Sequence, residues 1–145
     1  MIDPIIYDAD TLEGSSYVEI KPGRSAGRHW NKASIYLTDE TFTFLAPAIV
    51  KHHKNYSLFG ISRIDRETWK KILTELDKVK QALVDKPGAE NLKDLIGFLI
   101  LEETEKNFRK NPDQNCGDLI RLIAEFQTWV ENKTKDHDYL TILGI

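Results

Sequence analysis

The strongest constraint in the sequence is a stripe of large apolar residues that follows Asp65. The residues recur every three or four positions, the spacing that places side chains on one face of an α-helix. They are Trp69, Ile72, Leu76, Val79 and Leu83. Asp65 has a side chain favoured at a helix N-cap, and Ile64 before it can pack on Trp69 as a hydrophobic staple. Because Pro87-Gly88 ends the pattern, we expect a long amphipathic helix between these two signals.

Two further helices are expected after this one. Residues 89–109 are apolar on nearly all sides, which is typical of a central, buried helix, and Leu99→Ala should then cost about 2–5 kcal/mol. Asn111-Pro112 ends that helix. Residues 118–133 form the third helix, with an apolar stripe made of Leu119, Leu122, Ile123, Phe126, Trp129 and Val130.

The remaining segments indicate strands and one ambiguous region. Residues 17–20 and 34–37 are short strand signals between turns, and two strands alone must pack on helices. The threonines and phenylalanines of residues 38–53 would suit a strand, but an apolar helical face favours a helix that kinks or restarts at Pro47. The apolar residues 139–145 should dock as a last strand or extended segment.

Together these elements predict an α+β fold class. We expect a predominantly helical single domain over residues 1–145 with a small N-terminal antiparallel sheet. Its turn-rich sheet region covers about residues 1–37, its helical region about residues 38–135, and its apolar tail residues 139–145.

Composition limits the cellular setting and the partners. No apolar run approaches the roughly 20 residues that a bilayer crossing needs, and the first ten residues lack the features of a signal peptide. Cys116 is the single cysteine among 145 residues, so we expect a reducing, cytoplasmic setting and no membrane contact. The net charge of -3 argues against a nucleic-acid partner, since phosphate affinity comes from clustered lysine and arginine.

The candidate catalytic residues are few. His52 and His53 are adjacent, so their side chains diverge by about 100° in a helix, and we expect neither a metal site nor a cofactor. One enzyme hypothesis stays open, a small metal-independent hydrolase or nuclease. His29 would be its general base, while Arg24 and Arg28 would stabilise charge on the substrate.

Acidic residues offer a candidate partner-binding surface. Glu102, Glu103 and Glu105 follow the apolar part of the second helix, and they place negative charge at its C-terminal end, against the preference of the helix dipole. Either this turn simply projects into water, or it forms an acidic binding edge together with Asp113 and Asp118. An acidic edge would speed the encounter with a basic partner and fix its orientation.

Residues 55–69 carry a resemblance to a known class of proteins. The segment reads NYSLFGISRIDRETW, an aromatic-Ser-x-Phe-Gly element followed by isoleucine and a helix that opens with acidic residues and tryptophan. It resembles small bacterial immunity proteins of contact-dependent inhibition and other polymorphic toxin systems, and the similarity extends over about residues 35–83.

The resemblance implies binding without catalysis. Such a protein stays in the producer's cytoplasm and neutralises a cognate toxin domain, often a nuclease, by covering its active site or substrate surface in a one-to-one complex. No binding residue transfers from the resemblance, so the acidic residues above are predicted from charge placement alone. A regulatory or adaptor module with a different protein partner is the alternative.

Overall fold

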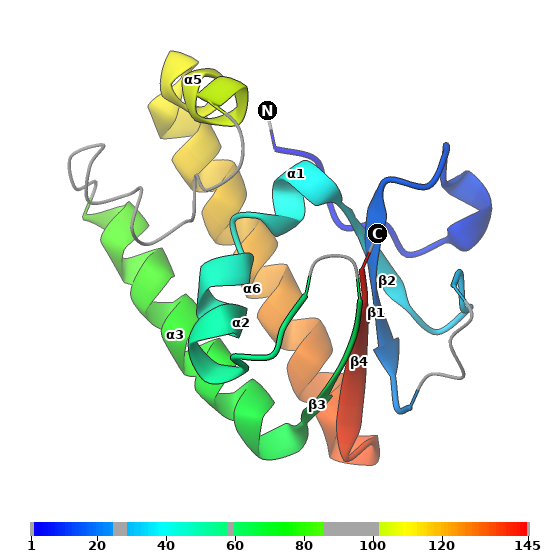
Figure 1. Cartoon of the computed structure of the whole chain (residues 1–145). Coiled ribbons are helices and arrows are strands. Elements are labelled where there is room, and N and C mark those ends of the chain that lie inside the picture. Colours follow the sequence, from blue (N-terminus) through cyan, green and yellow to red (C-terminus); the bar gives the residue numbers. More distant parts are fainter. Residues whose placement is uncertain (1, 25–28, 58–59, 86–101, 145) are drawn as a thin grey trace.

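A four-stranded antiparallel sheet with helices on one face organises the chain. The computed structural model describes residues 2–24, 29–57, 60–85 and 102–144 (Figure 1). The strands are β1 (Tyr17–Pro22), β2 (Ile35–Thr38), β3 (Ile61–Asp65) and β4 (Tyr139–Leu143), and their order across the sheet is β2-β1-β4-β3. The helices are η1 (Ala9–Thr11), α1 (Asp39–Phe42), α2 (Ala46–His52), α3 (Arg66–Val84), α5 (Glu102–Lys110) and α6 (Pro112–Asp136).

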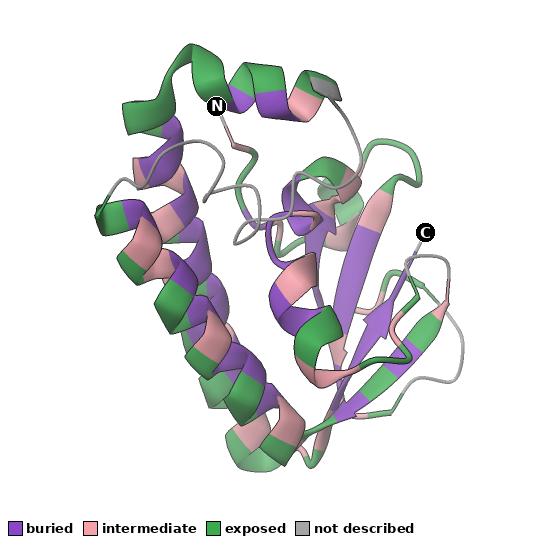
Figure 2. Ribbon diagram, turned by 60° about the vertical axis from the view of Figure 1, so that its left-hand side comes forward, coloured by how far each residue is buried: buried purple, intermediate pink, exposed green. Residues whose placement is uncertain are grey.

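The hydrophobic core lies between the sheet and the long helices α3 and α6. Alternate residues of the strands, such as Val18, Ile20 and Ile142, point into this core. The buried stripes of α3 and α6 face the same space (Figure 2). The centres of the Trp69 and Phe126 rings lie 6.1 Å apart there. The α+β fold class is therefore confirmed.

The best-patterned helix forms as expected. The Asp65 side chain accepts a hydrogen bond from the Thr68 backbone N–H at 2.7 Å and so caps α3. The ambiguous residues 38–53 are helical too, as favoured, but they form two short helices. Thr38 caps α1, and α2 restarts with Pro47 in its first turn, where proline loses no helical hydrogen bond.

The third helix begins earlier than expected. Helix α6 starts at Pro112 and not near residue 118, because a proline that ends one helix can also occupy the first turn of the next. Asn115 and Cys116 are consequently buried on its first turns and do not lie in a connection. Helix α5 ends at Lys110, as Asn111-Pro112 predicts. Residues 89–101 of the second expected helix, Leu99 included, lie outside the described residues.

The sheet extends beyond the two N-terminal strands. The C-terminal segment docks as a strand, as expected, and β4 pairs with β1 on one side and β3 on the other. Strand β3 was not predicted. Its buried positions include Ser62 while Ile61 is exposed, so its hydrophobic pattern does not match the face that it buries. Among the described residues, no helix is both long and apolar enough to cross a bilayer.

Candidate functional site

The described parts of the connection from β1 to β2, residues 23–24 and 29–34, contact the sheet on the side of Glu19 and Thr141, opposite to the core. The connection is anchored at two described points, where Thr141 Oγ1 donates to the Gly23 carbonyl oxygen at 2.7 Å and where His29 Nε2 lies 3.1 Å from the Gly144 carbonyl oxygen. Because of this cover, the polar side chains of Glu19 and Thr141 are fully buried on the outer face. These described parts of the connection therefore belong to the folded structure of the sheet.

Glu19 holds the second half of this connection. Its Oε1 accepts a hydrogen bond from the Trp30 backbone N–H at 2.6 Å. Its Oε2 accepts from the Asn31 backbone N–H at 3.0 Å, Asn31 Nδ2 at 2.8 Å and Ser34 Oγ at 2.5 Å. Hydrogen bonds to a carboxylate are about twice as strong as neutral ones. Four of them on one buried carboxylate fix the backbone of residues 30–34.

The fixed segment displays Trp30 in an uncommon conformation. Its φ is 64°, in the left-handed region that bulky residues rarely adopt. The indole is still 37% exposed, and it packs against the rings of His29 at 5.3 Å, Tyr36 at 5.8 Å and Tyr17 at 6.3 Å. We refer to Tyr17, His29 and Trp30 as the Trp30 surface. Residues held in sparsely populated backbone conformations cluster at functional sites, so Trp30 is a candidate functional residue.

Tyr36 packs against Trp30 from the sheet. Its side chain is fully buried, and its hydroxyl donates a hydrogen bond to the Asn31 carbonyl oxygen. Burial raises the pKa of Tyr36 to about 12, and the negative charge of Glu19 adds to the effect. The phenol is therefore neutral at physiological pH and acts as a donor to the segment that carries Trp30.

Positive side chains lie at the end of β1 and in the connection that follows it. Lys21 Nζ donates to the carbonyl oxygens of Pro22 at 3.2 Å and Arg24 at 3.0 Å, while the Arg24 guanidinium lies 5.3 Å from the centre of the Tyr139 ring. Lys32 is exposed in the same connection. Arg24 and the amine of Lys21 therefore lie at the Pro22 end of β1, whereas Trp30 packs on Tyr17 at the start of this strand.

The predicted acidic residues lie at the corner between α5 and α6. Two of the five carboxylates already pair with arginines. Glu103 is exposed on α5, and Asp113 is exposed in the first turn of α6. Glu105 is buried and pairs with Arg109 at 2.5 Å, and Asp118 pairs with Arg121. The side chain of Glu102 lies outside the described part of the chain.

Basic residues interrupt this corner. Lys106, Arg109 and Lys110 lie on α5 between and after the glutamates, and all three are exposed. The charge of α5 is therefore mixed, and the acidic binding edge stays a prediction.

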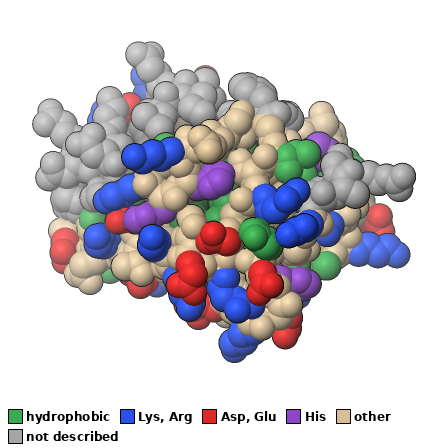
Figure 3. Space-filling model, turned by 60° about the horizontal axis from the view of Figure 1, so that its bottom comes forward, with side chains coloured by type: hydrophobic (Ala, Val, Ile, Leu, Met, Phe, Trp, Pro, Cys, Tyr) green, Lys and Arg blue, Asp and Glu red, His purple; other side chains and the backbone are tan. Residues whose placement is uncertain are grey.

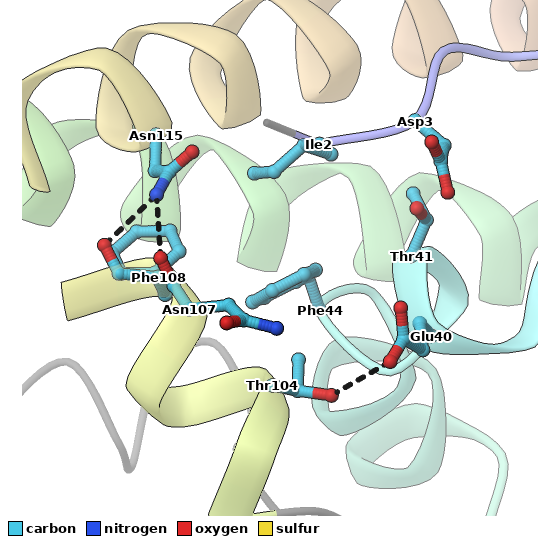
Figure 4. Close-up of a pocket in the computed structure, with 9 residues that line it drawn as sticks. All are labelled: Ile2, Asp3, Glu40, Thr41, Phe44, Thr104, Asn107, Phe108 and Asn115. Carbon is cyan, nitrogen blue, oxygen red and sulfur yellow. Dashed lines mark hydrogen bonds between the residues drawn. The ribbon is translucent and has the colours of Figure 1, made fainter. Parts of the chain in front are cut away.

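A small cavity lies where α5 meets α1, α6 and the N-terminal segment (Figure 4). Its volume is about 70 Å³, far below the several hundred Å³ of a small-molecule site. Asn115 Nδ2 donates to the carbonyl oxygens of Asn107 at 3.2 Å and Phe108 at 2.9 Å, and Thr104 Oγ1 donates to Glu40 Oε1 at 3.3 Å. These hydrogen bonds connect α5 to α1 and α6, so the cavity is part of a polar contact between helices.

The face formed by α2 and the start of α3 carries both signs of charge (Figure 3). Glu75 lies at its centre, with Lys51 Nζ at 3.0 Å, Lys78 Nζ at 3.3 Å and His52 Nε2 at 3.5 Å. Partial burial raises the pKa of Glu75, but the hydrogen bonds from the two lysines outweigh it and leave the pKa below its usual value. Lys51 and Lys78 therefore already have a carboxylate partner on this face.

The candidate catalytic residues do not form an open constellation in the described structure. His29 is engaged with Gly144, Arg24 lies over Tyr139, and Arg28 is outside the described residues. In the part of the chain that the structure describes, no three His, Cys, Asp or Glu side chains are grouped as metal ligands would be.

Comparison with known proteins adds no relative to these observations. Neither the family models nor the curated proteins nor the solved structures give a match to this chain. The candidate site therefore depends on its own geometry.

The residues that form the Trp30 surface were difficult to find from the sequence. Glu19 stands between Val18 and Ile20 in an alternating strand, where a charged residue normally indicates a solvated face. Only the cover supplied by a distant segment makes it a buried acceptor. The dipeptide Trp30-Asn31 in a glycine-punctuated connection was the available signal, since asparagine favours turns.

Proposed function

We propose that this chain is an immunity-type inhibitor that binds a toxin domain and neutralises it by covering its active site or substrate surface. The observation that carries the proposal is Trp30, an exposed tryptophan that Glu19 holds in a strained backbone conformation. The sequence resemblance of residues 55–69 to immunity proteins supports the same function. In this proposal the protein acts in the cytoplasm of the producing cell and performs no catalysis.

The geometry of the Trp30 surface suits a protein partner. Tryptophan and tyrosine are enriched among the residues that dominate binding energy in protein interfaces. A side chain that is already fixed in the free protein loses little conformational entropy on binding, so more of its contact energy appears as affinity. The four hydrogen bonds on Glu19 supply this pre-organisation.

Charge indicates how the partner would be oriented. Lys32 is exposed two residues after Trp30, so the part of the toxin that contacts the Trp30 surface would be neutral or acidic. The opposite requirement holds for the α5–α6 corner, where Glu103 and Asp113 would face a basic part of the partner. Complementary charge of this kind sets orientation and association rate more than affinity.

The test is binding and protection with the toxin domain encoded beside this chain. We expect a one-to-one complex by calorimetry and survival of cells that express both proteins. Trp30→Ala should weaken the complex by about 30-fold or more, the effect of losing an interface residue worth about 2 kcal/mol.

A matched control separates binding from general damage. Val84 is 59% exposed at the end of α3, so Val84→Ala should leave affinity within about twofold of wild type. If the wild-type protein forms no complex and gives no protection, the immunity function is wrong. If the complex forms but Trp30→Ala binds equally well, the Trp30 surface is not its interface.

A further inference from the structure

One side of the sheet ends in a strand whose outer edge is unpaired. The residues on either side of Ile61 and Arg63 form the backbone hydrogen bonds between β3 and β4. Two bonds at the ends of the strand fix this register. Gly144 N donates to Gly60 O at 2.9 Å, and Arg66 N donates to Asp138 O at 2.8 Å. In an antiparallel ladder the intervening residues direct their N–H and C=O groups to the other side. Within the described residues, these groups of Ile61 and Arg63 have no hydrogen-bond partner.

The opposite edge of the sheet is closed in a way that β3 is not. The N-terminal segment pairs with β2, because Ile6 N donates to Tyr36 O at 2.9 Å and Tyr36 N donates to Ile6 O at 2.8 Å. An uncovered edge is a ready template for another extended chain, and most proteins block it. Among the described residues, the N-terminal segment pairs with one edge of the sheet and none pairs with the other.

The side chains of the open edge have a definite chemistry. Ile61 is 56% exposed, and Arg63 is exposed two residues further along the same face. An added strand would place one side chain opposite each of them. The edge therefore fits an apolar residue opposite Ile61 and an acidic residue opposite Arg63.

We infer that the β3 edge binds an extended segment of a partner protein, which adds a fifth strand to the sheet and carries an acidic residue opposite Arg63. A second copy of this chain fits poorly. Self-pairing over all five residues of β3 is centred on Arg63, so it would place two guanidinium groups opposite each other. An acidic segment from another protein removes that repulsion.

The inference rests on the proposed function for the identity of its partner. The sheet connects the β3 edge to the Trp30 surface. Ile61 pairs with Leu143, and Leu143 pairs with Glu19, which holds Trp30. Adjacent strands lie about 4.8 Å apart, so β3 is about 10 Å from β1. One toxin domain can therefore contact the β3 edge and the Trp30 surface together.

The edge is tested without a toxin, with a capped heptapeptide that alternates valine and threonine around a central aspartate. Its matched control has lysine in place of the aspartate. At millimolar peptide, nuclear magnetic resonance should show slower solvent exchange of the Ile61 and Arg63 amides. The amides of Ser62 and Ile64 should change little, because they already face β4. The aspartate peptide should bind about two- to fivefold more tightly than the lysine peptide.

Two variants identify the physical basis of binding. Ile61→Pro removes an outward N–H but no bond to β4, and edge strands tolerate proline. We expect it to abolish peptide binding, while Ile61→Ala, which keeps the N–H, should weaken binding by a smaller factor. Arg63→Glu should reverse the preference so that the lysine peptide binds more tightly, and this variant does not depend on how well the proline is accommodated.

The outcomes separate this inference from the proposed function. Absence of amide protection in the wild-type protein, or equal binding by Ile61→Pro and Ile61→Ala, overturns strand addition. An unchanged peptide preference in Arg63→Glu overturns the acidic partner segment. Peptide binding at the edge without any toxin complex would instead contradict the immunity function and leave the edge site standing.

Discussion

At the scale of single residues, the buried carboxylate of Glu19 is the feature with the largest expected effect. Glu19→Ala leaves the N–H groups of Trp30 and Asn31 and the Ser34 hydroxyl without their acceptor. The free energy of unfolding should fall by about 2–4 kcal/mol, measured by urea denaturation with circular dichroism. Glu19→Gln keeps one acceptor oxygen and should lose about half as much. A loss below about 0.5 kcal/mol for the alanine variant would show that residues 30–34 hold their conformation without this carboxylate.

The backbone of Trp30 gives a second prediction at this scale. At φ 64° a side chain costs about 1 kcal/mol, so Trp30→Gly should be more stable than Trp30→Ala by about that amount. The order reverses at an exposed helical position such as Lys71 on α3, where glycine should be about 1 kcal/mol less stable than alanine. Thermal unfolding of the four variants measures both differences. The same order at both positions would contradict the left-handed backbone of Trp30.

At the scale of elements, local signals predicted helices better than strands. Asp65 and the stripe from Trp69 onward act within a few residues of each other, so they fix the start of α3 without help from the rest of the chain. Strand β3 was not predicted because one of its buried positions is the polar Ser62 and one of its exposed positions is the apolar Ile61. The early start of α6 was missed because Asn111-Pro112 both ends one helix and begins the next. The sequence prediction used it only as a helix end.

The cap of α3 carries a pH-dependent prediction. The hydrogen bond from the Thr68 backbone N–H lowers the pKa of Asp65 below its usual 3.8. The stabilisation is therefore present above pH 3.8 and is lost as the pH falls through the lower pKa of the folded state. At neutral pH, Asp65→Ala should cost about 1 kcal/mol, whereas Asp65→Asn should keep most of the cap. Urea denaturation across acidic pH should show the wild-type advantage over alanine shrinking, and a constant difference would rule out the charged cap.

At the scale of the whole molecule, the sheet order depends on long-range pairing that no local pattern contains. The alternation of residues 17–20 and the apolar tail predicted that strands form, but neither indicates that β4 lies between β1 and β3. The candidate site has the same origin. Glu19, Trp30 and Gly144 come together only when the tail enters the sheet and the β1–β2 connection folds over it. The partner-binding residues proposed from sequence, by contrast, were chosen by charge at the end of one expected helix and near the start of the next.

The central position of β4 makes the C-terminal strand essential to the fold. Ile142 is fully buried on β4 and faces the helices, so Ile142→Ala should lower the free energy of unfolding by about 2–5 kcal/mol. Ile61→Ala removes the same atoms from an exposed position on the neighbouring strand and should cost under about 1 kcal/mol. Urea denaturation of both variants gives the comparison directly. Similar losses would place the tail at the border of the sheet, where it could not connect the Trp30 surface to the β3 edge.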